Sequence, residues 1–166
     1  MKRCYTVLML IVSCGIAFAE DDAKTYYVGE TVVTATKQEA RVEDVPQPVT
    51  VIPGTEISDR GMYNAGEALD FVPGVRIIRS GTVGASNGVS IRSLNGGPSS
   101  NKTLVLLDGR PVNDAWAGGV NFHSIPTELI DRIEVVRGPG SALYGSQASG
   151  GVINVFTKNP APGFHG

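Results

Sequence analysis

Ser86 is the residue whose surroundings come nearest to a known catalytic motif. Gly84-Ala85-Ser86-Asn87-Gly88 has the G-x-S-x-G spacing of a nucleophile elbow, in which a serine occupies a tight turn between a strand and a helix. Residues 89–94 alternate between apolar and polar types, which indicates a strand where the elbow requires a helix. An exported hydrolase acting through Ser86 stays an alternative, but the pattern argues against an enzyme.

Two further groups have the residue types for chemistry without the spacing. Gly138-Pro139-Gly140 opens like a dinucleotide-binding loop, yet Leu143 occupies the position of the third glycine. His123 and His165 lack neighbouring carboxylates at metal-ligand spacing. We therefore expect no cofactor, no metal site and no catalytic residue.

The first residues of the chain indicate export. Two cations precede an apolar run, and Ala17-Phe18-Ala19 is a small-x-small cleavage site before an acidic stretch, so residues 1–19 are predicted to be a signal peptide. Both cysteines lie in this segment, so its removal excludes a disulfide or thiolate site from the exported product. The alternative is a lipoprotein cleavage box that would leave a lipidated Cys14 at the new N-terminus.

The composition describes an acidic domain rich in loops. The formal charge of the 166-residue chain is −2, and loss of the two leader cations lowers it to about −4, which disfavours nucleic-acid binding. The 21 glycines and 10 prolines exceed the average share but stay below the level typical of disorder. The length fits one globular domain.

Short strands and helical turns are predicted to alternate along the second part of the chain. Asn64 and Glu67 form a capping box ahead of an amphipathic run, Thr55 is a second candidate N-cap, and the apolar run 104–107 is expected at the centre of a sheet. The fold class is therefore α/β (α+β), a small mixed β-sheet with short helices and long Gly-rich loops. The expected strands are 48–53, 75–78, 89–94, 104–107, 133–136 and 151–156, and the expected helical turns are 55–61, 65–72, 126–130 and 141–144.

Residues 20–44 have scattered charges and no helical periodicity, so they are predicted to be a flexible arm before a folded domain at 45–158. The arm contains the β-prone segment Glu30-Thr31-Val32-Val33-Thr34-Ala35. Such a segment can add itself as a strand to the exposed sheet edge of a partner. It can equally be the first strand of the fold, and composition alone leaves both interpretations open.

The order of these segments resembles that of a known family. Residues 30–35 are similar to the TonB box of TonB-dependent outer-membrane receptors, and residues 45–158 are similar to their plug domain. Each matching string is short, but the strings keep their order over most of the exported chain. They cover residues 47–52, 69–75, 89–92, 106–112, 125–126, 130–139, 141–145 and 150–155.

The resemblance implies a receptor function at the cell outer membrane. Family members enclose the plug in a barrel of about 22 strands, which this chain does not contain, and residues 159–166 correspond to the start of the linker to it. The chain is then a fragment, a truncated receptor or a free-standing plug. The expected partners are a TonB-type energy-coupling protein and a metal chelate, a ferric siderophore first and haem or cobalamin next. The alternative is a stand-alone periplasmic binding module that has a plug fold and performs no transport by itself.

The resemblance also implies site residues. The box at 30–35 would bind TonB, and Arg92 and Arg137 correspond to arginines that pair with barrel-wall carboxylates and latch the plug. A solvated arginine or an internal salt bridge is the alternative for both, and Ser93 stands where the family often has glycine. Loops 80–88, 95–102 and 113–122 would face the ligand. The candidate contacts are Ser86, Asn87, Asn95, Ser99, Asn101, Trp116 and Phe122, although the two aromatic residues can equally be loop anchors.

Overall fold

The computed structural model describes residues 31–32, 34–81, 85–93 and 102–159 of the chain. The predicted signal peptide, the alternative lipidation site at Cys14 and the first part of the predicted arm lie outside the described residues, as do residues 160–166. Among the described residues, no helix combines the length and the apolar character needed to cross a bilayer.

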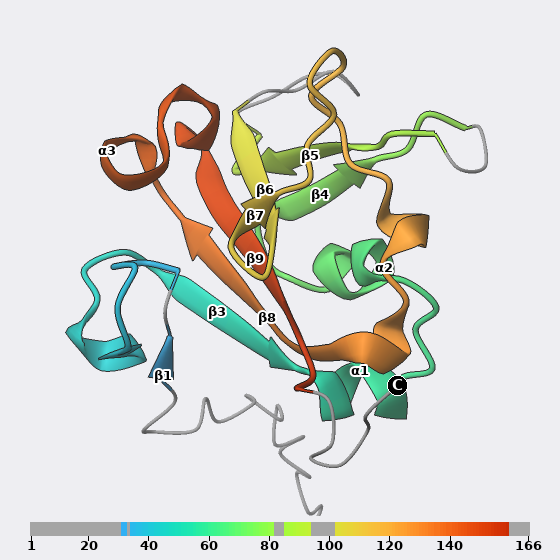
Figure 1. Cartoon of the computed structure of the whole chain (residues 1–166), viewed down its shortest axis with the longest axis horizontal. Coiled ribbons are helices and arrows are strands. Elements are labelled where there is room, and N and C mark those ends of the chain that lie inside the picture. Colours follow the sequence, from blue (N-terminus) through green and yellow to red (C-terminus); the bar gives the residue numbers. More distant parts are fainter. Residues whose placement is uncertain (1–30, 33, 82–84, 94–101, 160–166) are drawn as a thin grey trace, which may run out of the picture.

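A five-stranded mixed sheet with the order β3-β8-β9-β6-β7 forms the body of the domain (Figure 1). β3, β8 and β9 are antiparallel neighbours, whereas β6 runs parallel to β9. The predicted fold class, a small mixed sheet with short helices, is confirmed. The strands are β3 (Val49–Pro53), β6 (Thr103–Leu107), β7 (Arg110–Pro111), β8 (Ile130–Arg137) and β9 (Gly151–Thr157).

The position of β6 differs from the prediction. β9 occupies the middle of the sheet, and β6 lies between β9 and the two-residue strand β7. The apolar run 104–107 correctly indicated a strand buried on both faces, but burial does not specify the place of a strand in the order. The edge position of β3 agrees with the proline at its end, because proline removes a ladder donor.

Two short helices and a strand pair lie against this sheet: α1 (Gly54–Asp59), α2 (Ala65–Asp70), and the antiparallel strands β4 (Val75–Ile78) and β5 (Gly88–Ile91). α2 begins at the predicted cap, where the Asn64 side chain accepts from the Glu67 N–H at 3.2 Å. The Glu67 carboxylate in turn accepts from the Tyr63 N–H at 2.9 Å. The predicted Thr55 cap is wrong, because Pro53 already holds the extended cap conformation and α1 starts directly after it.

The remaining elements are short. β5 ends earlier than predicted because Arg92 and Ser93 adopt left-handed backbone angles, with φ of 51° and 60°. The helical turn predicted at 141–144 is present as α3 (Ser141–Tyr144), and that at 126–130 is the shorter η3 (Thr127–Leu129). The other elements are β1 (Thr31–Val32), β2 (Ala40–Arg41), η1 (Val42–Asp44), η2 (Phe122–Ser124) and η4 (Ser146–Ala148).

Alternation along the strands divides the core into two clusters. On what we call the helix face, Ile133, Val135 and Ile153 pack with α1, α2, β4 and β5. The opposite face is called the hairpin face, after the hairpin formed by β1 and β2. There, Val136 and Val152 pack with residues from the N-terminal part of the chain and with Ala148 of η4. Both faces of the sheet are therefore covered, which explains why its strands are almost continuously apolar.

Candidate functional site

The N-terminal hairpin, residues 31–41 apart from residue 33, contains most of the predicted TonB box. β1 pairs with β2 in antiparallel fashion, with Val32 opposite Ala40. The Thr36 hydroxyl donates to the Gln38 carbonyl oxygen at 2.6 Å in the turn between them. Glu30 and Val33 lie outside the described residues.

The described half of the predicted arm differs from the expected flexible chain. Val32 is fully buried, and Thr34 and Ala35 are 1% and 6% exposed. Val32, Ala35 and Val45 all belong to the cluster on the hairpin face. Among the described residues, the folded part therefore already includes Val32 rather than starting near Val45, because burial of these apolar side chains on the sheet is favourable.

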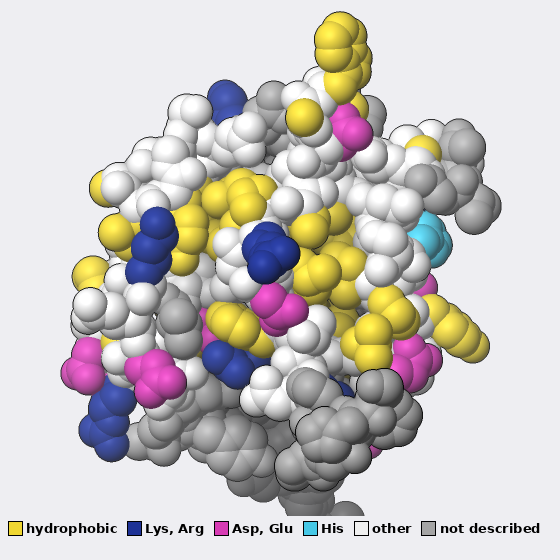
Figure 2. All heavy atoms as spheres, in the orientation of Figure 1, with side chains coloured by type: hydrophobic (Ala, Val, Ile, Leu, Met, Phe, Trp, Pro, Cys, Tyr) yellow, Lys and Arg dark blue, Asp and Glu magenta, His cyan; other side chains and the backbone are white. Residues whose placement is uncertain are grey.

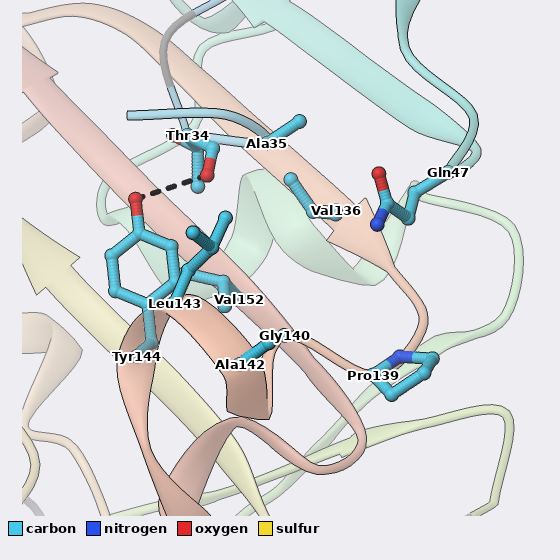
Figure 3. Close-up of a pocket in the computed structure, with 10 residues that line it drawn as sticks. All are labelled: Thr34, Ala35, Gln47, Val136, Pro139, Gly140, Ala142, Leu143, Tyr144 and Val152. Carbon is cyan, nitrogen blue, oxygen red and sulfur yellow. Dashed lines mark hydrogen bonds between the residues drawn. The ribbon is translucent and has the colours of Figure 1, made fainter. Parts of the chain in front are cut away.

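Thr34 is held through its main chain. Its N–H donates to Oε2 of Glu134 at 2.8 Å, and its carbonyl oxygen accepts from the Tyr144 hydroxyl at 2.9 Å (Figure 3). Glu134 belongs to β8 and Tyr144 to α3, so two elements of the body grip one residue of the hairpin. Both main-chain polar groups of this buried residue are thereby satisfied.

Glu134 is a fully buried carboxylate on the hairpin face. Its Oε1 accepts from Nε of Arg132 at 3.0 Å, while Oε2 receives the Thr34 N–H. The Arg132 guanidinium also lies 4.1 Å from the centre of the Phe156 ring. A buried carboxylate is tolerated when it is paired and hydrogen-bonded, and the hairpin supplies one of these bonds.

Tyr144 contacts the hairpin through its hydroxyl, at Thr34, and through its ring, at Lys37. Burial raises the pKa of the Tyr144 phenol above its ordinary value of 10.0, and the nearby Glu134 carboxylate acts in the same direction. The hydroxyl is therefore a protonated donor at neutral pH. The Lys37 ammonium lies 4.7 Å from the centre of the Tyr144 ring, which is a cation–π distance.

A cavity of about 50 Å³ lies beside the Thr34 contact. In Figure 3, Thr34 and Ala35 lie across from side chains of β8, α3 and β9, with the Tyr144 hydroxyl directed at Thr34. Ligand pockets for small molecules measure about 300 to 1,000 Å³, so this surface holds the hairpin and leaves no room for a chelate. We call the surface formed by Glu134, Val136, Leu143, Tyr144 and Val152 the seat.

The two predicted latch arginines meet at one turn, between α2 and β4. Arg137 donates from Nη1 to the Pro73 carbonyl at 3.1 Å and from Nη2 to the Thr50 hydroxyl at 2.9 Å. Arg92 is exposed, and its main-chain N–H donates to the Gly74 carbonyl at 2.7 Å. Within the described part of the chain, the buried Nε of Arg137 has no hydrogen-bond partner.

The predicted ligand contacts fall into three groups. Asn95, Ser99 and Asn101 lie outside the described residues. Asn87 is buried, and its side chain accepts from the Ser80 N–H at 3.3 Å. Ser86, beside it, is half-buried and precedes strand β5 instead of a helix, so the nucleophile-elbow geometry is absent at this residue.

The two predicted aromatic contacts have opposite environments. Trp116 is 96% exposed on the loop after β7, where the Asp114 carboxylate accepts from the Trp116 and Ala117 N–H groups at 2.9 and 2.6 Å. These two main-chain bonds, that of Ala117 first, lower the pKa of Asp114. Phe122 is 1% exposed in the cluster on the helix face. It is therefore an anchor of the core, the alternative that the sequence had left open.

A second, more open hollow of about 290 Å³ brings Asn87 and Phe122 to one place, with Glu67, Arg79 and His123 around it. Its volume approaches the lower end of the range for ligand pockets. No group of three or more His, Cys, Asp or Glu side chains suited to a metal ion occurs in the part of the chain that the structure describes.

Glu134 and Tyr144 were not among the predicted site residues. Glu134 interrupts the apolar run of β8, and an acidic residue inside a strand that is buried on both faces is a signal that the sequence did contain. Tyr144 gave no such signal, because a tyrosine at the end of a helical turn has many ordinary roles. Its contact with Thr34 joins residues 110 positions apart.

A known family matches most of the region described above. The family model of the TonB-dependent Receptor Plug Domain matches residues 41–152. The chain is also 44% identical over 128 residues to the vitamin B12 transporter BtuB of Vibrio vulnificus strain CMCP6, a match that covers 77% of this chain and 20% of that protein. The chain thus spans about a fifth of the length of this relative.

Solved structures share the fold. FpvA of P. aeruginosa, bound to heterologous pyoverdines, matches with a TM-score of 0.63 and 25% identity over 78% of this chain and 16% of its own. The ferric yersiniabactin uptake receptor FyuA of Yersinia pestis matches with a TM-score of 0.54 and 27% identity over 69% of this chain and 17% of its own. The resemblance inferred from the ordered sequence strings is confirmed.

Proposed function

Because the chain belongs to the TonB-dependent receptor plug domain family, we propose that it is the plug portion of an outer-membrane receptor that gates energy-coupled uptake of a scarce nutrient chelate. The family match over residues 41–152 carries this proposal. The face of the molecule seen in Figure 2 mixes apolar, cationic and anionic side chains, which suits a body enclosed by the polar lumen of a wide barrel. No catalytic step belongs to the proposed function.

The proposed cargo is a ferric siderophore, with cobalamin and haem as alternatives. FyuA and FpvA, which share the fold, are described with yersiniabactin and pyoverdines, whereas the relative from Vibrio vulnificus is described as a vitamin B12 transporter. Equilibrium dialysis with a ferric siderophore, cyanocobalamin and haem would separate these cargoes in a receptor that joins this chain to a barrel. Binding of cyanocobalamin alone would overturn the siderophore assignment.

Trp116 is the described residue best placed for a ligand contact, because its side chain is 96% exposed on a loop held by Asp114. We expect Trp116→Ala to weaken chelate binding about tenfold in the joined receptor, through loss of aromatic contact area. Tyr63→Ala is the matched control, since Tyr63 is also exposed, at 85%, and precedes α2. Equal effects of the two variants would remove Trp116 from the site.

The box at residues 30–35 is proposed to bind TonB by strand addition. Val33→Pro should abolish capture of the chain by a soluble C-terminal fragment of TonB, because proline deletes a ladder donor. Glu39→Pro is the control on the same segment, since Glu39 is exposed and lies outside the strands. Unchanged capture of Val33→Pro would contradict the assignment of the box.

Arg92 and Arg137 are proposed to latch the plug to carboxylates on the barrel wall. The meeting of both residues at the Pro73–Gly74 turn supports a shared task, and an unpaired buried guanidinium nitrogen is costly. In the joined receptor, Arg137→Glu should accelerate hydrogen exchange around residues 133–137, whereas Arg76→Glu, an exposed change on β4, should leave it unaltered. Equal exchange rates in both variants would contradict the latch and would limit the role of Arg137 to its hydrogen bonds within the plug.

The stand-alone periplasmic module is the alternative architecture. It predicts a chain that binds a chelate without any barrel, whereas the receptor predicts binding only after joining to one. The reading frame beyond the codon for Gly166 provides a second test. Alternating strands of about ten residues there would support the receptor, and an immediate terminator would support the module.

Export by cleavage after residue 19 is part of the same proposal. Mass spectrometry of the mature N-terminus should give a first residue of Glu20. A lipidated Cys14 at the N-terminus would anchor the exported chain in a membrane and would overturn this assignment.

A further inference from the structure

The seat engages the main-chain groups that a partner strand would need. Strand addition uses main-chain N–H and C=O groups as its donors and acceptors. In the structure, the Thr34 N–H donates to Glu134 and the Thr34 carbonyl accepts from Tyr144. A single N–H cannot make a second well-aligned bond while the first persists, so docking and strand pairing at Thr34 exclude each other.

We propose that Glu134 and Tyr144 are positioning residues that set the affinity of the box for its coupling protein, by holding Thr34 in a docked state that cannot pair with a partner strand. This inference rests on the proposed binding of TonB to residues 30–35. It assigns to two residues of the body a direct influence on a binding event in which they form no contact of their own.

The apolar part of the hairpin supports the same conclusion. Val32 and Ala35 flank Thr34 and are almost completely buried in the cluster on the hairpin face. These side chains are unavailable to a partner in the docked state. Only molecules with a released hairpin can bind TonB. The apparent affinity for TonB is therefore proportional to the fraction of molecules in the released state.

Tyr144 is the more discriminating of the two positions. Replacement by phenylalanine deletes the bond to the Thr34 carbonyl and leaves the ring in place for its contact with Lys37. Loss of one such hydrogen bond should raise the released fraction about fivefold, and the apparent affinity for TonB should rise by the same factor. A change inside the box, such as Val33→Pro, acts in the opposite direction.

Glu134→Gln provides a second variant. Glutamine retains a carbonyl oxygen for the Thr34 N–H but loses the charge that pairs with Arg132. A neutral acceptor forms a weaker bond than a carboxylate, so this variant should also increase the released fraction. Its thermal unfolding is measured alongside, so that a general loss of folding is recognised.

The experiment uses the full chain and two measurements. The first is the amide exchange rate of Thr34 by NMR, and the second is the dissociation constant for the soluble TonB C-terminal fragment. Tyr144→Phe should exchange Thr34 about fivefold faster and bind TonB about fivefold more tightly than the unaltered chain. Tyr63→Phe is the matched control, because its hydroxyl lies on a side chain that is 85% exposed, and it should change neither value.

The outcomes separate this inference from the proposed function. Unchanged exchange of Thr34 in Tyr144→Phe would show that the Tyr144 hydroxyl does not hold the hairpin, and would overturn the proposal. Faster exchange with unchanged or weaker TonB binding would overturn the competition between docking and pairing. If neither the unaltered chain nor any variant binds the TonB fragment, the proposed function fails together with the competition, while the exchange rates still show whether Glu134 and Tyr144 hold the hairpin.

Discussion

The two faces of the five-stranded sheet are covered in different ways. On the helix face, fully buried side chains such as Ile57, Leu69 and Ile91 join α1, α2 and β5 to the sheet through apolar packing. On the hairpin face, two polar side chains of the body hold the main chain of Thr34, and Val32 and Ala35 add a small apolar contribution. Covers held by few contacts open locally at lower free energy than the global fold. The comparison therefore distinguishes a permanent cover from a releasable one.

Gly151 should show the largest effect, because a side chain there would collide with the neighbouring strand β8 and with β5. A Cβ atom there would lie 2.5 Å from the Val136 carbonyl oxygen and 2.6 Å from Ile91, at a φ of +152°. Gly151→Ala should lower the free energy of unfolding by about 3 to 5 kcal/mol, from overpacking and backbone strain together. Gly109→Ala, at a φ of +78° with no atom within 4 Å, should lose only about 1 kcal/mol. Urea denaturation checks both values, and similar losses would contradict the steric account.

Ile153→Ala tests the helix face. Ile153 is fully buried on the central strand β9 and packs in the cluster with α1 and α2. Removal of this much buried side chain should lower the free energy of unfolding by about 3 kcal/mol. Because this cover is integral to the fold, circular dichroism and the exchange of core amides should report the same loss. Discordant transitions would show that the helix face also opens separately.

Val32→Ala tests the hairpin face. Val32 is fully buried, and the substitution should weaken docking by about 1.5 kcal/mol. For a body that stays folded when the hairpin leaves, the loss in global stability cannot exceed the docking free energy. Val105→Ala is the matched control, since Val105 is also fully buried but belongs to the helix face. Exchange of the Thr34 amide should accelerate in Val32→Ala and stay unchanged in Val105→Ala; the reverse pattern would invalidate the comparison.

The smallest effect is expected from alkaline pH. The pKa of Tyr144 is raised above 10.0 in the docked state, by burial first and by Glu134 second. A raised pKa means that docking is fully favoured below pH 10.0 and weakens as the pH climbs through the raised value. The difference in tyrosinate absorbance between the unaltered chain and Tyr144→Phe isolates this phenol. Ionisation at or below its ordinary pKa would contradict the partly buried position of the phenol beside Glu134.

Much of the fold follows from local patterns in the sequence. The capping pair Asn64 and Glu67 placed the start of α2, and period-two or continuous apolar runs located the main strands. Strand order was not accessible in the same way, since the burial of residues 104–107 is equally compatible with β6 at the middle of the sheet or beside it. The end of β5 depended on left-handed angles at Arg92 and Ser93, which no residue type there demands.

The candidate site was predictable only in part. The β-prone character of residues 30–35 indicated a segment that can form a strand with a partner. The docked state of Thr34 depends on contacts with Glu134 and Tyr144, about 100 positions away in the sequence. Phe122 illustrates the same limit, because an aromatic residue in a loop can face a ligand or enter the core, and the choice is made by tertiary packing. Interactions within one short segment can be predicted from the sequence, whereas contacts between segments far apart in the chain cannot.

The Arg132–Glu134 pair has a consequence for the reversibility of docking. When the hairpin departs, the Glu134 carboxylate loses the Thr34 donor but keeps the guanidinium on its own strand. The seat without the hairpin therefore contains an ion pair instead of an isolated buried anion, which would be far more costly. In the proposed receptor, the hairpin can then leave and return repeatedly without exposing a carboxylate that has lost all of its partners.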